Sequence, residues 1–343
     1  MKKLSVRTVV VCLAAATLST ACSKTSSNAN EGAGGAGPTP LPSRNAPATI
    51  DGQLFDAFSG GGISDVVIAS SAGSTLSDAG GHFQLTTTAG DSVDARLSRG
   101  GYIDRETTLR AGDGAARLSM IRDDFDLRTF DEMFRAPQLQ RWTTTPVLLV
   151  EGTTLRFAGF DRSDAEATSG RVSDSEMGSL IDDLRWGLST LTGGHYSDFA
   201  SVQRQQSAAG AQVGVLNPGV ITVALYQGLT ATTGYWGYGR TLVQSDGTIV
   251  GGSIMIDRDF NASGSPRRRA LRVHELGHAL GANHVTLRAS VMNAQVSTEP
   301  TAYDRTAGLL AYQRAAGNRY PDVDPSGSRI NAAHSARWSA GVQ

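Results

Sequence analysis

Short apolar runs alternate with glycine-rich turns between residues 48 and 112. The apolar runs are Ile50 to Phe55, Val66 to Ala69, Phe83 to Leu85 and Val93 to Leu97. Turns such as Gly60-Gly61-Gly62 and Gly80-Gly81 separate them. Short strands divided by turn residues at this spacing are typical of a small β-sandwich. We therefore expect an all-β unit in the first third of the chain.

The pattern changes beyond residue 120, where longer amphipathic stretches begin. Phe125 to Phe134 has helical spacing, and Pro146 to Val150 is an apolar run of strand type. Ser173 can cap a helix in which Glu176 completes a capping box. One face of that helix is apolar, formed by Leu180, Ile181, Leu184 and Leu188. Gly193-Gly194 ends the helix.

Two further strands and another helix follow. Val220 to Leu225 indicates a buried strand, and Thr248 to Ile256 indicates a second one, interrupted by Gly251-Gly252. A helical stretch then opens at Arg268. Strand, helix, strand, strand and helix is an order typical of the α+β class.

Composition adds limits to this picture. A length of 343 residues favours two folded units with tethers. A formal net charge of -1 gives no electrostatic reason to expect a nucleic acid as partner. The two cysteines are Cys12 and Cys22, so no disulfide framework can form beyond residue 22. The sequence gives no prediction of the oligomeric state.

The first 22 residues have the features of an export signal. Basic residues precede the apolar run Val9 to Leu18, which is too short to span a bilayer of about 30 Å as a helix. Leu18-Ser19-Thr20-Ala21-Cys22 resembles the lipobox of bacterial lipoproteins, although Ser19 stands where an aliphatic residue is usual. The resemblance implies lipidation of Cys22, a membrane anchor, and a place in the cell envelope, at the outer membrane or cell surface. An ordinary secretory signal cut near Ala21 is the alternative.

Three of the six histidines lie within eleven residues, in His274-Glu275-Leu276-Gly277-His278-Ala279-Leu280-Gly281-Ala282-Asn283-His284. His274 and His278 are four residues apart, which puts both imidazoles on one face of a helix. Gly281 has the backbone freedom to end the helix, so that His284 can approach from another direction. Three histidines leave the fourth position of a tetrahedral Zn²⁺ open for water, as in catalytic sites. Glu275 is then the expected catalytic base.

This string resembles the metzincin pattern H-E-x-x-H-x-x-G-x-x-H, and Met292 in Ser290-Val291-Met292-Asn293 resembles the Met-turn of that family. The resemblance implies a zinc endopeptidase with a mixed twisted sheet, an active-site helix and a final helix around Ala307 to Tyr312. It assigns metal binding to His274, His278 and His284, catalysis to Glu275, and structural support of the site to Gly281 and Met292. Ser-Val-Met-Asn is closest to the matrixin branch. In this family, a peptide or protein substrate pairs with an edge strand, here expected between Gly239 and Ile256.

Residues 48–115 resemble the transthyretin-like, carboxypeptidase-regulatory-type domain. The matching segments are Gly52-Gln53-Leu54, Gly62 to Val66, Ser77 to Phe83 and Gly100-Gly101-Tyr102. The resemblance implies a spacer or docking module, and an inhibitory prodomain remains an alternative.

The expected organisation is therefore α+β, with a metzincin-type zincin domain preceded by a small β-sandwich. The expected segments are a lipoprotein signal (1–22), a flexible tether (23–47), the β-sandwich (48–115), a connecting region (116–145), the metalloprotease domain (146–325) and a C-terminal tail (326–343).

Two classes of function remain open. The first is a zinc endopeptidase acting on extracytoplasmic proteins. The second is a surface lipoprotein whose β-sandwich binds a partner and whose zinc domain is latent or non-catalytic. Asp322-Val323-Asp324 begins like a calcium-binding EF-hand loop, but the twelfth position is Ala333 rather than glutamate. An EF-hand is therefore rejected, and a structural calcium of another type has no support in the sequence.

Overall fold

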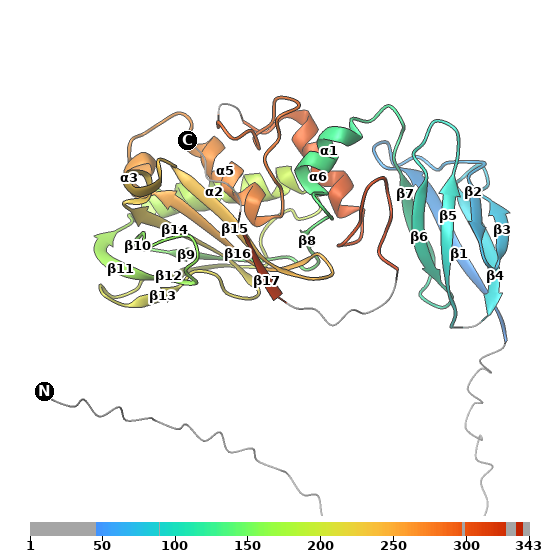
Figure 1. Cartoon of the computed structure of the whole chain (residues 1–343), viewed down its shortest axis with the longest axis horizontal. Coiled ribbons are helices and arrows are strands. Elements are labelled where there is room, and N and C mark those ends of the chain that lie inside the picture. Colours follow the sequence, from blue (N-terminus) through green and yellow to red (C-terminus); the bar gives the residue numbers. More distant parts are fainter. Residues whose placement is uncertain (1–45, 89, 297–298, 327–333, 339–343) are drawn as a thin grey trace, which may run out of the picture. The chain divides into compact units, whose positions relative to one another are not determined.

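The computed structural model in Figure 1 describes residues 46–88, 90–296, 299–326 and 334–338. The predicted signal, Cys22 and nearly all of the predicted tether lie outside the described residues. No helix in the described ranges is long and apolar enough to cross a membrane.

The first part of the chain consists of strands. They are β1 (Pro47–Asp56), β2 (Val67–Ser70), β3 (Gly73–Leu76), β4 (His82–Thr88), β5 (Ser92–Ser98), β6 (Arg105–Arg110) and β7 (Ala116–Met120). They form two sheets, in the orders β4-β1-β7 and β3-β2-β5-β6. Exposed and buried residues alternate along β4 and β5, as they do in strands that bury one face.

These two sheets share one apolar core. Its members include Ile50, Leu54, Ile68, Phe83, Leu85, Val93, Leu97, Leu109 and Met120. The arrangement is a β-sandwich. Strand β7 pairs in parallel with β1, so the first sheet extends to Met120, beyond residue 115 where the sequence places the boundary.

The rest of the chain combines helices with one large sheet. Its helices are α1 (Leu127–Phe134), α2 (Asp174–Leu191), α3 (Leu229–Thr233), α4 (Arg258–Ala262), α5 (Arg268–Ala279) and α6 (Ala302–Tyr312). Its strands are β8 (Arg141–Trp142), β9 (Val147–Glu151), β10 (Thr153–Arg156), β11 (Asp164–Arg171), β12 (Val202–Gln205), β13 (Gln212–Gly214), β14 (Val220–Gln227), β15 (Gly237–Gln244), β16 (Thr248–Asp257) and β17 (His334–Trp338).

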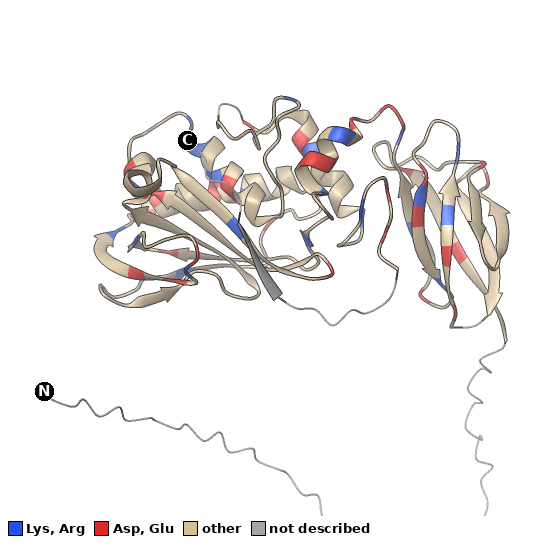
Figure 2. Cartoon of the chain, viewed as in Figure 1, with Lys and Arg blue, Asp and Glu red and all other residues tan. Residues whose placement is uncertain are grey.

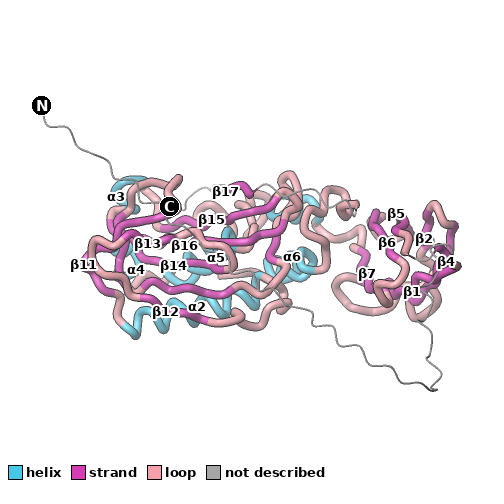
Figure 3. Tube along the Cα trace, turned by 90° about the horizontal axis from the view of Figure 1, so that it is seen from below, coloured by secondary structure: helices cyan, strands magenta, loops and turns pink. Residues whose placement is uncertain are grey.

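The large sheet is mixed. Strand β14 pairs in parallel with β9 and β16, whereas β15 pairs antiparallel with β16. Strand β12 extends the sheet beside β9, and β17 pairs with the other side of β15. Figure 3 shows β14, β16 and β15 running side by side. The chain therefore belongs to the α+β class, as predicted.

Helices α2, α5 and α6 cover one face of this sheet (Figure 1). The alternation along β14 explains why both faces are buried: Ile221 and Val223 pack in the core with the helices, whereas Tyr226 packs in a second core on the other face. Helices α2 and α5 approach closely at Gly187, where a Cβ atom would lie 3.0 Å from the side chain of Val273. This packing holds α5 against the sheet.

Two local predictions are wrong. Ser173 caps α2 by accepting a hydrogen bond from the Glu176 N–H, but the Glu176 side chain accepts hydrogen bonds from Arg258 and Asn261 instead of completing a capping box. A charged donor makes a stronger hydrogen bond than a backbone N–H, which accounts for the difference.

The second error concerns Gly251 and Gly252, which do not interrupt the strand. Strand β16 is continuous through both. A Cβ atom at Gly251 would lie 2.7 Å from the Asn217 carbonyl oxygen, and one at Gly252 would lie 3.3 Å from the Ala279 Cβ. These glycines therefore allow neighbouring segments to approach the strand closely.

A buried ionic network joins the segment after α6 to strands β6 and β7. Arg314 donates two hydrogen bonds to Asp322, at 2.7 and 2.8 Å, and one to the Ser119 hydroxyl. Arg105 donates two to Asp324. Guanidinium groups therefore neutralise both carboxylates, and this pairing gives no support to a calcium ion there. Across the described residues, Figure 2 shows acidic and basic residues interspersed rather than gathered in one element.

Replacing Arg314 with alanine should strongly destabilise the protein. Both side chains of the Arg314–Asp322 pair are fully buried, and removing one partner of such a pair costs about 3–5 kcal/mol. Within the described residues, Asp322 would keep as its charged partner only the more distant Arg135, whose Nη1 lies 3.8 Å from the Asp322 Oδ1. Urea unfolding measures the loss. The matched control is Arg96→Ala, which breaks the exposed Arg96–Asp104 pair and should have little effect on stability, because exposed ion pairs are screened by solvent. Equal effects of the two substitutions would contradict the buried network.

Candidate metal centre

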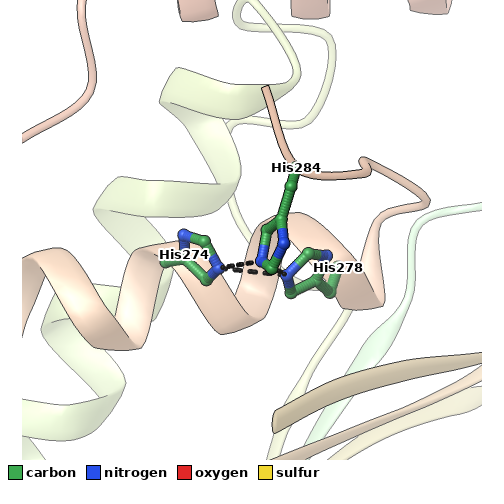
Figure 4. A group of neighbouring side chains, drawn as sticks. All are labelled: His274, His278 and His284. Carbon is green, nitrogen blue, oxygen red and sulfur yellow. Dashed lines mark hydrogen bonds between the residues drawn. The ribbon is translucent and has the colours of Figure 1, made fainter. Parts of the chain in front are cut away.

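Helix α5 carries two of the three clustered histidines, and the chain reversal after it brings the third. All residues of α5 from Ala270 to Ala279 are buried. Gly281 has a φ of +99°, a conformation that L residues with side chains rarely adopt, and a Cβ atom there would collide with the Gln140 carbonyl oxygen. The helix therefore ends at this glycine, as predicted. Figure 4 shows His274 and His278 on the helix, with His284 reaching them from the following segment.

The three imidazoles meet through their Nε2 atoms. The Nε2–Nε2 distance is 3.0 Å between His274 and His278, and His284 lies 3.2 Å from each of the other two. Within the described residues, this is the one group of three or more histidine, cysteine, aspartate or glutamate side chains that can hold a metal ion.

Backbone carbonyls determine which ring nitrogen carries the proton. The Nδ1 atom of His274 lies 2.6 Å from the Val291 carbonyl oxygen, and that of His278 lies 2.8 Å from the Ala282 carbonyl oxygen. A carbonyl oxygen only accepts, so each Nδ1 must be the donor. In a neutral ring, Nε2 is then a bare acceptor. Two acceptor lone pairs facing each other at 3.0 Å repel, and a cation between them removes the repulsion.

The distances fit a small tetrahedral cation. Zn–N bonds of about 2.0–2.1 Å at tetrahedral angles place two ligand nitrogens about 3.3–3.4 Å apart. The observed separations of 3.0–3.2 Å are a few tenths of an ångström shorter. An all-nitrogen donor set is unsuited to calcium, which prefers oxygen ligands. The cluster can therefore bind a metal ion.

Burial keeps the histidines in the form that binds metal. Desolvation lowers the pKa of His274 to about 3 and lowers the pKa of His278 well below its ordinary value. It also lowers the pKa of His284. All three rings are thus neutral near pH 7, as ligation requires.

Glu275 lies fully buried beside this cluster, at the contact between α5 and β15. Burial raises the pKa of its carboxyl well above the ordinary value, and the backbone N–H of Gly239 partly opposes that shift. A raised pKa means that the carboxyl holds a proton more tightly than an exposed glutamate does, as a group that delivers a proton must.

Met292 is also fully buried. A Cβ atom at Gly277 of α5 would collide with its sulfur atom, so the Met292 side chain packs directly against the helix between His274 and His278. The adjacent Val291 supplies the carbonyl oxygen that orients His274. The structure therefore brings together all six residues assigned to the centre by the resemblance: His274, Glu275, His278, Gly281, His284 and Met292.

Sequence reasoning missed three residues that shape this centre. At Gly237 a Cβ atom would collide with the Glu275 carboxylate, and at Gly239 one would collide with the backbone of α5 and with His278. The buried Asp304 of α6 accepts hydrogen bonds from the Ser290 hydroxyl and the Val291 N–H. It therefore fixes the segment that orients His274.

The glycine pair of β15 and Asp304 each left a signal in the sequence. Gly237 and Gly239 are spaced by two, which puts them on one face of a strand. Thr301 and Asp304 form a capping box, which would have placed the start of the final helix at Ala302 rather than Ala307.

The predicted substrate-binding segment contains most of β15 and of β16. In the described part of the chain, β15 is not an edge strand, because β17 pairs with it. The nearby aromatic residues are packed in pairs, with Trp236 stacked on Phe260 and Tyr238 against Phe160.

Comparison with known proteins adds no family assignment. Neither a protein-family model nor a curated protein matched the sequence.

Replacing His284 with alanine should abolish tight metal binding. It removes one of three nitrogen ligands, and its partial exposure limits the effect on folding. The loss of a residue that hydrogen-bonds a metal ligand typically lowers the affinity for the metal by roughly 10–100-fold. We expect a larger fall in metal affinity here, because the ligand itself is lost. Metal content after dialysis against a buffered metal solution measures this. His195→Ala, outside the cluster, is the control and should keep full metal content.

Asp304→Asn should weaken metal binding by about 10–100-fold, because Asp304 positions the carbonyl that orients His274. Competition with a chromogenic chelator gives the affinity, and circular dichroism checks the fold. An affinity equal to that of the unaltered chain would show that Asp304 has no part in orienting His274.

Proposed function

We propose that this chain is a zinc-dependent endopeptidase of the metzincin type. The observation that carries the proposal is the convergence of three imidazole Nε2 atoms, two of them on the helix that also carries the buried Glu275. Imidazole ligands suit zinc, and their separations fit its tetrahedral geometry. Three protein ligands leave one position open, as catalytic zinc sites do.

The topology around the centre supports the metzincin assignment. A mixed sheet carries an antiparallel strand, β15, next to the helix that bears the first two histidines. A glycine of positive φ ends that helix before the third histidine, and a buried methionine underlies it. These features agree with the resemblance of the His274 to His284 string.

In the proposed reaction, His274, His278 and His284 hold the zinc ion. Bound zinc would polarise the scissile carbonyl and lower the pKa of water toward about 7. Glu275 accepts the proton of the attacking water and later delivers it to the departing amine nitrogen. Its buried position between α5 and β15 restricts the access of bulk water to that proton.

The remaining assignments are part of the same proposal. Cys22 carries the lipid anchor of an exported envelope protein, at the outer membrane or cell surface, and residues 23–47 are the tether. The β-sandwich acts as a spacer or docking module. The partners are protein or peptide substrates, not nucleic acid.

Glu275→Gln tests the proposed chemistry directly. The substitution keeps the size of the side chain and removes its ability to take a proton, so cleavage of casein should fall by about 10²–10⁴-fold. Zinc content should stay at one ion per chain. Glu299→Gln is the control, because Glu299 is an exposed acid paired with Arg269, and it should leave cleavage unchanged.

The controls separate the proposal from its main alternative. Chelation should remove the activity and added zinc should restore it. Full cleavage by the Glu275→Gln protein would overturn the role of Glu275. A full zinc load with no cleavage by any form of the chain would instead favour a binding lipoprotein with a non-catalytic zinc domain.

A further inference from the structure

The C-terminal strand β17 occupies the outer side of β15. The pairing is antiparallel and runs from Gln244 opposite His334 to Arg240 opposite Trp338. Figure 1 shows β17 beside β15. Strand β17 begins fifty residues after His284. It is thus hydrogen-bonded to β15, the strand that packs against the metal centre.

The residues of β15 next to this paired stretch form one wall of the centre. The backbone at Gly237 packs against the Glu275 carboxylate, and the backbone at Gly239 packs against His278. The pairing with β17 begins at the next residue, Arg240. An extended peptide that bound along β15 to reach the centre would have to form hydrogen bonds with the same main-chain groups of β15 that pair with β17.

The composition of β17 indicates pairing through the main chain. Three of its five residues are polar or charged: His334, Ser335 and Arg337. Strand addition relies on backbone hydrogen bonds, which any extended peptide can offer. A peptide substrate could therefore replace β17 without matching its side chains.

The covalent link favours this pairing without making it permanent. Seven residues, 327–333, separate His334 from Ser326. A short linker gives a tethered segment an effective concentration in the millimolar range, so weak pairing is enough to keep it in place. A substrate of higher affinity can still displace it.

We propose that β17 is an internal competitor of the substrate. It pairs with β15 at the place where an extended peptide substrate would pair, and it thereby inhibits the protease. This inference rests on the proposed function. Substrate binding then requires β17 to leave. The apparent affinity for the substrate equals the intrinsic affinity multiplied by the fraction of molecules in which β15 is free.

Deleting residues 327–343 should lower the KM for a quenched-fluorescence peptide of ten residues by about ten-fold, the effect of a competitor bound nine-tenths of the time. The kcat should stay unchanged, because the residues of the metal centre are intact. The double substitution Ala336→Pro and Arg337→Pro, made in the full chain, should have the same effect, since proline removes the backbone N–H.

The matched control is Ala336→Ser with Arg337→Ala. It changes the same two side chains but keeps both N–H groups, so its KM should equal that of the unaltered chain. A KM lowered equally by this control would overturn pairing through the main chain. An unchanged KM in both the deletion and the proline variant, with the peptide still cleaved, would overturn the competition.

A binding measurement separates this inference from the proposed function. A labelled peptide of residues 334–343 should bind the zinc-loaded chain that ends at Ser326, as measured by fluorescence anisotropy, and should not bind the full chain. Hydrogen exchange at β15 should slow when the peptide is added. If no variant cleaves any peptide yet the labelled peptide binds in this way, the endopeptidase proposal fails and the occupancy of β15 by β17 stands. Equal binding to the full and shortened chains would overturn that occupancy.

Discussion

Three imidazole Nε2 atoms held 3.0–3.2 Å apart are the constraint on which the rest of this molecule depends. Neutral imidazoles do not adopt this arrangement by mutual attraction. The surrounding fold must supply the force, through the carbonyl oxygens of Val291 and Ala282 and the packing of α5 between α2 and the sheet. Binding a cation converts this electrostatic cost into a gain, so folding and metal binding reinforce each other.

The order of the elements follows from this constraint. Helix α5 supplies two of the clustered histidines at a fixed separation, and the third, His284, comes from outside the helix. Gly281 makes that return possible, and the segment around Met292 closes the centre from below. Asp304 then links this segment to α6, so the last helix stabilises a centre formed by residues twenty to thirty positions earlier. The ligand geometry thus depends on contacts that are distant in sequence.

The sequence predicts the parts of the fold that depend on neighbours along the chain. The i, i+4 histidines, the end of α5 at Gly281, the short strands β4 and β5 and the cap at Ser173 are all local. The predictions are wrong where a residue that is distant in the sequence determines the local structure. Glu176 binds Arg258 and Asn261 rather than its own helix start, and Gly251 and Gly252 allow close packing inside a continuous strand. The pairing of β17 with β15 likewise has no local signal, since its residues could be extended without a defined partner.

The two glycines of β15 that border Glu275 have a further consequence. A glycine loses more conformational freedom than an alanine when it is ordered in a strand, at a cost of roughly 0.5–1 kcal/mol for each position. Strand β15 therefore has little intrinsic tendency to remain extended at Gly237 and Gly239. It must gain its order from the strands that flank it, so the wall of the metal centre becomes most rigid when another backbone pairs along β15.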